Sequence, residues 1–156
     1  MSPASIRTAL RETPASLACL QLPLQGSTLL LPCVALAELI ALPALEALPG
    51  MPPWLLGQIR WRERTLPLLS FEALGGGTPV APRRVAVLNA QGEVPGLACY
   101  ALALQGIPRA CRVDAGLETH GAPGALELAA VELGGERLGI PDLPALEQAL
   151  AGCWPR

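Results

Sequence analysis

Residues 48–75, LPGMPPWLLGQIRWRERTLPLLSFEALG, contain a Pro/Gly-rich loop, two apolar segments joined by a charged turn, and a residue that can cap a helix. Apolar residues on both sides of Arg62-Glu63 predict a β-hairpin. The side chain of Ser70 can then accept a hydrogen bond from a backbone N–H at the start of a short helix, and Gly75 can end that helix. We therefore expect a hairpin that leads directly into a single helical turn.

The same order of residue types returns later in the chain. Residues 57–74, GQIRWRERTLPLLSFEAL, align without a gap with residues 129–146, AAVELGGERLGIPDLPAL. The matching pairs are Ile59 with Val131, Leu66 with Leu138, Leu68 with Ile140, Ser70 with Asp142, Phe71 with Leu143, and Leu74 with Leu146. This repeat predicts two similar small β modules, each closed by a short helix. Chance convergence of the two hairpins is the alternative.

Composition favours a β-rich globular protein. Apolar residues make up 51% of the 156 residues and aromatics only 3%, so the core must consist of aliphatic side chains. The 17 prolines and 16 glycines are too many for long helices, and the aliphatic content is too high for a disordered chain. We expect short strands and frequent turns.

Short apolar runs between turn residues predict the remaining strands. Outside the two hairpins, we expect strands at 17–22, 28–32, 84–88, 97–102 and 109–113. Residues 34–41 fit helix and strand spacing equally, and we favour a turn followed by a strand. The polar segment 114–124 is expected to be a mobile loop. Residues 1–14 are expected to form a flexible tail before one domain at 15–153.

Charge and cysteine content narrow the function classes. The formal net charge is −2 and all 11 basic residues are arginines, so we expect no nucleic-acid partner and no Schiff-base chemistry. The five cysteines lack a Cys-x-x-Cys pair and the chain has a single histidine, which argues against a zinc site or a disulfide framework. We expect reduced thiols in a cytoplasmic protein, without metal or cofactor.

Export and membrane insertion are also disfavoured. Arg7, Arg11 and Glu12 interrupt the apolar run that a secretory signal needs. Residues 29–48 have about the length of a membrane span, but two prolines and two glutamates lie among them. A carboxylate near the centre of a bilayer costs roughly 2.5 to 3.5 kcal/mol on insertion scales. We therefore expect no membrane insertion.

Catalytic motifs are nearly absent. The chain contains no Gly-x-Ser-x-Gly, no phosphate-binding glycine loop and no His-Glu-x-x-His. Cys111 and His120 are the one conceivable nucleophile and base, but nothing in the sequence orients or activates either group. A small apolar residue within a strand is the simpler interpretation of Cys111. We expect a protein that is not an enzyme.

Three arginines alternate with other residues around the first hairpin turn. In one continuous strand Arg60, Arg62 and Arg64 would share a face and Trp61 would point to the other, and a solvated hairpin tip is the simplest interpretation. Arg62 can also reach Glu38, a carboxylate in an otherwise apolar segment, where an unpaired buried charge would be costly. That pair would brace the hairpin against a neighbouring strand.

The segment PGMPPWLLGQIRWRERTLPLLSFEAL closely resembles the core of CheW-like coupling domains. Those domains have a Pro-Gly-x-Pro-like loop, a Gly-x-Ile-Asn-Leu-Arg-Gly hairpin, and Pro-apolar-apolar-Asp before a short helix. The resemblance covers roughly residues 15–151. Within it, CVALAELI is similar to the family's Val-Arg-Glu-Ile segment, with Glu38 in the glutamate position, and residues 126–140 are similar to its second hairpin.

The resemblance implies an all-β fold of two SH3-like five-stranded β-barrel subdomains that share an apolar core, with short capping helices. It implies a non-enzymatic scaffold between the cytoplasmic tip of a chemoreceptor and the regulatory domain of a CheA-like histidine kinase, with other CheW-like proteins as further partners. Leu36, Glu38, Gly57 and Arg62 would lie at or beside the receptor-facing surface. In the alternative interpretations Gly57 serves only strand packing and Leu36 belongs to the core.

This chain departs from the family pattern at three hairpin positions. Arg60 stands where the family has Asn, Trp61 where it has Leu, and Glu63 where it has Gly, so the sequence does not assure the usual hairpin geometry. Trp61-Arg62, followed by the segment Leu-Pro-Leu-Leu-Ser-Phe-Glu, resembles the ChpC and PilI type of pilus-linked chemosensory systems more than the flagellar type. The high hydropathy also fits another class, a carrier that holds a small hydrophobic ligand in a loosely filled barrel.

Overall fold

The computed structural model describes residues 3, 16–114 and 116–154. The expected tail at 1–14 therefore lies outside the described residues, apart from Pro3. The elements are β1 (Leu17–Pro23), β2 (Thr28–Pro32), the 3-10 helix η1 (Cys33–Ala35), β3 (Leu36–Ala41), β4 (Leu55–Trp61), β5 (Arg64–Leu69), α2 (Phe71–Leu74), β6 (Arg84–Asn89), β7 (Cys99–Leu104), β8 (Arg109–Val113), β9 (Glu118–Thr119), β10 (Glu127–Leu133), β11 (Glu136–Pro141) and α3 (Leu143–Ala151). No helix in these residues combines the length and the apolar character needed to cross a bilayer.

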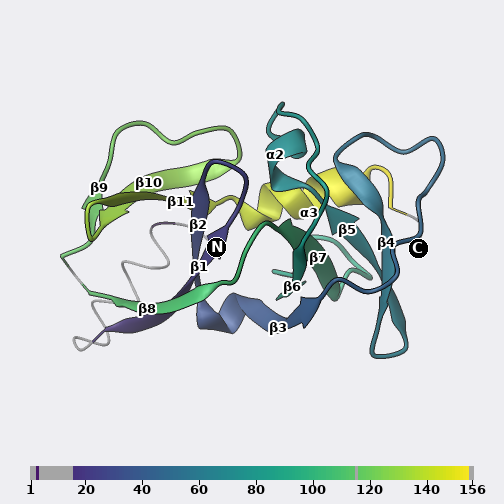
Figure 1. Cartoon of the computed structure of the whole chain (residues 1–156), viewed down its shortest axis with the longest axis horizontal. Coiled ribbons are helices and arrows are strands. Elements are labelled where there is room, and N and C mark those ends of the chain that lie inside the picture. The colour runs from purple at the N-terminus through teal and green to yellow at the C-terminus, as the bar shows by residue number, and fades with distance from the viewer. Residues whose placement is uncertain (1–2, 4–15, 115, 155–156) are drawn as a thin grey trace.

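The strands form two sheets that lie side by side along the long axis of the molecule (Figure 1). One sheet has the strand order β8-β1-β2-β11-β10-β9, and the other has the order β3-β6-β7-β5-β4. The expected β fold with short helices is confirmed. Five strands were expected in each unit. The first sheet has six, because β9 is added at its edge. Thr119 pairs with Val131 on the outer edge of β10, so part of the segment expected to be a mobile loop is a strand.

The two sheets have the same topology once the chain is permuted. Strands β3, β4, β5, β6 and β7 of one sheet occupy the places of β8, β10, β11, β1 and β2 in the other. The correspondence includes the single parallel pair of each sheet, β5 with β7 and β11 with β2. The second unit therefore obtains its last two strands from the N-terminal part of the chain. The repeat in the sequence shows the two hairpins, but it does not show that β1 and β2 complete the second unit.

The two hairpins agree in register as well as in residue type. Ile59 pairs with Leu66 in the first, and Val131 pairs with Leu138 in the second. The first strand of each hairpin also has a register shift at the same place, at 55–57 in β4 and at 127–129 in β10. Because the shifts are also 72 positions apart, the duplication predicted from the apolar pattern extends to the backbone.

The helix that follows each hairpin begins in the same way. Ala73 N–H donates to Ser70 Oγ at 3.2 Å, and Ala145 N–H donates to Asp142 Oδ1 at 3.2 Å. These bonds satisfy one of the unpaired backbone donors at each helix start. Both cap residues therefore have the role expected from the sequence.

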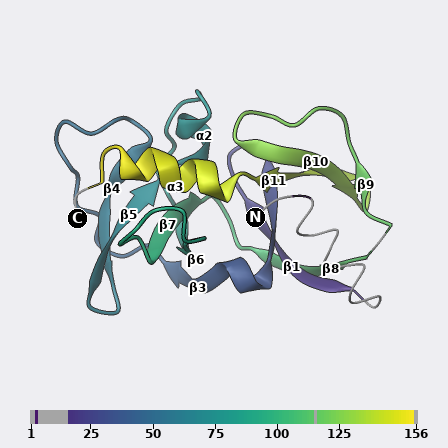
Figure 2. The same ribbon diagram turned by 180° about the vertical axis from the view of Figure 1, so that it is seen from behind.

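Among the described residues, mostly aliphatic side chains form three buried clusters. The common core joins both sheets and both helices, and includes Leu22, Leu29, Phe71, Leu88, Tyr100, Leu102, Leu143, Leu146 and Leu150. Two smaller clusters lie within the individual sheets, one around Leu30 and Leu138 and the other around Val85 and Val87. Helix α3 extends from the end of β11 and crosses the other sheet, which contains β3 to β7, so it links the two units (Figure 2).

Candidate functional site

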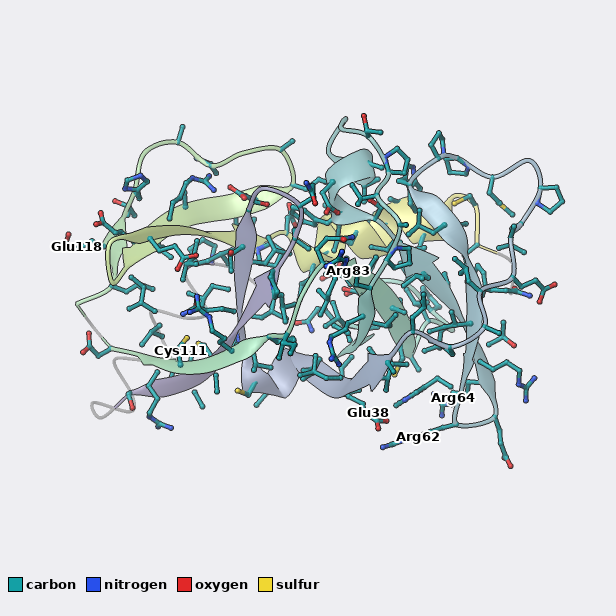
Figure 3. The ribbon with its side chains drawn as sticks, in the orientation of Figure 1. Glu38, Arg62, Arg64, Arg83, Cys111 and Glu118 are labelled. Atoms are coloured by element: carbon teal, nitrogen blue, oxygen red, sulfur yellow. The ribbon has the colours of Figure 1, made fainter. Side chains whose placement is uncertain are left out.

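Glu38, Trp61 and Arg62 form a compact group that we call the hairpin-tip cluster. Arg62 Nη2 lies 3.2 Å from Glu38 Oε1, and Trp61 Nε1 donates a hydrogen bond of 2.8 Å to the same oxygen. The Arg62 guanidinium carbon lies 4.7 Å from the centroid of the Trp61 ring, within cation–π range. Figure 3 shows Glu38 on β3 facing Arg62 at the tip of the β4–β5 hairpin. The expected ion pair between Arg62 and Glu38 is confirmed.

The fold brings these residues together from the two edges of one sheet. β3 and β4 are the first and the last strands in the order β3-β6-β7-β5-β4. A register shift between Leu36 and Glu38 on β3 inserts one extra residue, and such bulges redirect the side chains that follow. Trp61 is the last residue of β4. The cluster therefore closes the sheet by side-chain contacts where the two edge strands approach.

The hairpin turn keeps a tight geometry without glycine. Arg62 and Glu63 have φ angles of 47° and 63°, and the equivalent Gly134 and Gly135 have 59° and 78°. Positive φ at both central residues is typical of a type I′ turn, whose twist matches that of the flanking strands. The turn therefore keeps the type I′ backbone conformation although Glu63 replaces the usual glycine.

The turn also determines on which faces of the hairpin the arginines lie. Trp61 pairs with Arg64 across the hairpin, and Arg60 pairs with Thr65. Directly paired residues of an antiparallel ladder point to the same face, so Arg64 lies on the Trp61 side and Arg60 on the other. The arginines therefore do not share the single face that they would have in one continuous strand, because the two turn residues interrupt the alternation.

Trp61 holds the Glu38 carboxylate more firmly than Arg62 does. The side chains of Arg62 and Glu38 are 67% and 40% exposed, so their ion pair contributes only about 0 to 1 kcal/mol. A hydrogen bond to a charged group contributes roughly 1.5 to 3 kcal/mol. Arg62 pairs with Glu38 through one nitrogen, and a guanidinium has five N–H donors. The arginine is thus positioned but still has donors for a partner.

Gly57 is buried and is not part of the cluster. The Glu46 N–H and carbonyl both bond to the backbone of Gln58, at 2.9 and 2.8 Å, so the loop after β3 lies directly on β4. A Cβ on Gly57 would collide with the Glu46 carbonyl oxygen, and Gly57 has a φ of 149°. The close approach of this loop explains the glycine.

Leu36 is half-buried and also lies apart from the cluster. It pairs with Leu88 and packs against the common core. Exposed aliphatic side chains lie instead at neighbouring positions along this segment. We call them the β3 apolar strip: Val34, Leu39, Leu42 and Leu45, which are 77%, 39%, 38% and 37% exposed. The leucine-rich composition of 34–45 was the signal for this strip, but periodicity alone did not separate exposed from buried positions.

Glu147 on α3 is a buried carboxylate that the sequence analysis did not single out. It is 0% exposed, and its two oxygens each accept a 2.9 Å hydrogen bond from the Gln91 N–H. Tyr100 Oη donates to Oε2 at 3.3 Å. Burial raises the pKa of Glu147, and these hydrogen bonds oppose the rise. Its place between Leu146 and Leu150 on the apolar face of the helix was the available signal.

Cys111 and His120 have different neighbours in the structure. Cys111 lies directly opposite Cys19 on neighbouring strands, and burial raises the pKa of the Cys19 thiol to about 12. His120 Nδ1 lies 3.3 Å from Glu132 Oε2. Within 16–114 and 116–154, no group of three or more His, Cys, Asp or Glu residues could hold a metal ion.

The family follows from comparison with known proteins. A family model described as the CheW-like domain matches residues 18–149, most of the chain. The chain belongs to the CheW-like family. Members of this family are non-catalytic scaffolds, so membership gives the chain a scaffold or adaptor role in chemotaxis.

The solved structures agree with this fold. This CheW-like chain is similar to the crystal structure of the scaffolding protein TtCheW from Thermoanaerobacter tengcongensis, with a TM-score of 0.67 and 13% sequence identity. The match covers 81% of this chain and 88% of that one. At this identity the likeness concerns the fold alone. A search of the curated proteins found no match.

Proposed function

We propose that this CheW-like protein links the cytoplasmic tip of a chemoreceptor to the regulatory domain of a CheA-type histidine kinase. The proposal joins the family's scaffold role to one observation, the hairpin-tip cluster. That cluster holds an arginine in a defined position while its side chain stays 67% exposed. An arginine held in this way can bind a carboxylate on a partner without first losing much conformational freedom. The functional unit is residues 15–153.

The receptor-facing surface of this proposal lies around the hairpin-tip cluster. Arg62 supplies donors for a receptor carboxylate, and Glu38 keeps the guanidinium in place. Leu36 supports this surface from the half-buried side of β3, and the β3 apolar strip supplies exposed hydrophobic contacts. Gly57 acts indirectly, because it lets the loop at 42–54 lie on β4.

The pilus-linked assignment rests on the hairpin itself. Trp61 stands where the family pattern has leucine, and its indole N–H makes the shortest contact to Glu38 in the cluster. Glu63 adds an exposed carboxylate at the turn. We propose that these two residues adapt the surface to the receptor and kinase of a pilus-linked chemosensory system.

Arg62→Ala tests the proposed partner surface. We expect at least tenfold weaker capture of the receptor fragment or of the kinase regulatory domain, because a charge-assisted hydrogen bond contributes roughly 1.5 to 3 kcal/mol. The melting temperature should change by about 2 °C or less, since the ion pair that is lost is exposed. Arg83→Ala, at another exposed arginine, is the matched control and should leave capture unchanged.

Two outcomes would contradict the proposal. A large fall in melting temperature with intact capture would assign Arg62 to structure. Equal or stronger capture by the kinase regulatory domain of a flagellar system, compared with that of a pilus-linked system, would remove the pilus assignment while leaving the scaffold role in place.

A further inference from the structure

Two cysteines face each other on neighbouring strands of the first sheet. Cys19 of β1 and Cys111 of β8 are direct partners in the antiparallel ladder. Directly paired residues of such a ladder point to the same face of the sheet, and their Cβ atoms lie about 4.5 to 5.5 Å apart. Cys19 belongs to the buried cluster around Leu30 and Leu138, and Cys111 packs against that cluster. The two thiols therefore lie on the same side of the sheet.

The spacing of the two strands suits a disulfide after a small movement. A disulfide joins residues whose Cα atoms are about 4.4 to 6.8 Å apart and whose Cβ atoms are about 3.5 to 4.5 Å apart. The Cα atoms of opposite ladder residues are about 4.5 to 5.5 Å apart, which is already within this range. The Cβ atoms must approach each other by about 1 Å. β8 can make this movement because it is an edge strand, paired within the sheet to β1 alone.

The other cysteines do not share this arrangement. Cys33 lies in η1 after β2 and packs against the common core, not against the cluster that contains Cys19. Cys99 belongs to the other sheet, and Cys153 follows helix α3. Among the ladder partners of the described strands, Cys19 and Cys111 are the one pair of cysteines, and both are free thiols in the structure.

We propose that Cys19 and Cys111 are a redox modification site, at which hydrogen peroxide forms a reversible disulfide that holds β8 on β1. The bond closes a loop that contains every element from β2 to β7. The strain of bringing the two Cβ atoms together makes such a bond easier to reduce, so thiols can restore the reduced form. Figure 3 shows Cys111 on the far side of the molecule from Arg62, and the site requires neither a receptor nor a kinase. It therefore goes beyond the proposed scaffold function.

Exposure sets the order in which the two thiols react. Cys111 is half-buried and Cys19 is fully buried, and burial raises the pKa of Cys19 to about 12, so Cys19 stays protonated while Cys111 meets the oxidant. The Cys111 thiolate attacks one peroxide oxygen, the O–O bond breaks, and Cys111 becomes a sulfenic acid as hydroxide leaves. Cys19 then loses its proton and attacks the Cys111 sulfur, the S–O bond breaks, and a second hydroxide leaves. Two thiols and one hydrogen peroxide thus give one disulfide and two water molecules.

Mass spectrometry of the chain after peroxide treatment tests for the bond. Trypsin should release residues 110–112 linked to residues 12–60, and dithiothreitol should separate the two peptides. Because residues 12–60 contain both Cys19 and Cys33, Cys33→Ser is the matched control and should give the same linked peptides. Cys19→Ser should instead stop at the Cys111 sulfenic acid, which dimedone traps. Failure of the wild type or of Cys33→Ser to give the linked peptides, or their persistence in dithiothreitol, would overturn the proposal.

Stability and hydrogen exchange test whether the bond holds β8 on β1. The melting temperature of the oxidised wild type should exceed that of the reduced protein by about 4 °C or more, because the cross-link restricts the unfolded chain. Amide exchange in β8 should slow at least tenfold, since β8 can then no longer separate from β1. Cys111→Ser, treated with peroxide in the same way, should show neither change. A melting temperature that falls on oxidation, or exchange in β8 that stays the same, would show that the disulfide does not hold this strand.

Discussion

The turn of the first hairpin contains a residue that the backbone disfavours, and replacing it should stabilise the protein. Glu63 has a φ of 63°, and its side chain is exposed. A left-handed conformation costs a residue with a Cβ roughly 1 to 2 kcal/mol. Glycine avoids this cost but loses roughly 0.5 to 1 kcal/mol more conformational entropy on folding. For Glu63→Gly we therefore expect a net gain of about 0.5 to 1 kcal/mol in the free energy of unfolding.

Thermal unfolding measures this gain. For a chain of this size, 1 kcal/mol corresponds to a shift of about 2 to 4 °C, so the melting temperature should rise by about 1 to 4 °C. The reciprocal change Gly135→Glu, at the equivalent position with a φ of 78°, should lower the melting temperature by a similar amount.

A third variant provides the control for a general effect of glycine. Glu93 is exposed and is not among the residues with positive φ, so Glu93→Gly should lower the melting temperature. If Glu63→Gly is neutral or destabilising, or if Gly135→Glu is tolerated without loss, backbone conformation does not limit the stability of these turns and the reasoning fails.

Two further predictions concern buried positions. Gly57→Ala should cost about 2 to 4 kcal/mol and lower the melting temperature by about 5 to 15 °C, because the new Cβ would collide with the Glu46 carbonyl. Gly50→Ala, where φ is also positive but no atom lies within 4 Å, should cost clearly less, and equal losses would contradict the role given to the Glu46 contact. Glu147 has a raised pKa in the folded state, so the folded chain binds more protons than the unfolded chain as pH rises above the ordinary carboxylate pKa of about 4.3. Between the ordinary carboxylate pKa and the raised pKa of Glu147, this group should therefore lower the free energy of unfolding of the wild type as pH rises. Glu147→Gln lacks the group, so the melting temperature of the variant relative to the wild type should increase from pH 4 to pH 8. A difference that stays constant or shrinks would show that the buried carboxylate is not destabilised by ionisation.

Most strands could be predicted because their signals are local. Turn residues at Gln25-Gly26-Ser27 and Gly134-Gly135 separate short apolar runs, and the strands lie close to where those runs predicted them. The exception is β9, whose two residues carry no apolar pattern. Its existence depends on the open edge of β10, which is formed by a different part of the chain.

The candidate site could be predicted only in part. Glu38 was conspicuous because it is a charge among apolar residues, and Arg62 because it lies at a turn, so their pairing was a reasonable inference. The contribution of Trp61 was not predicted, because its indole N–H reaches Glu38 only after a bulge in β3 and the closure of the sheet bring the two edges together. The same closure places the loop of Glu46 over Gly57.

The sequence by itself determined the duplicated hairpins, their caps and the family, because periodicity, turn chemistry and capping act over a few neighbouring residues. Only the tertiary structure decided that the second unit is completed by β1 and β2, and that Glu147 is buried against the loop of Gln91. These features depend on contacts between residues distant in the chain. Such contacts form because burial of the common core outweighs the entropy of bringing those segments together, and no short stretch of sequence records that balance.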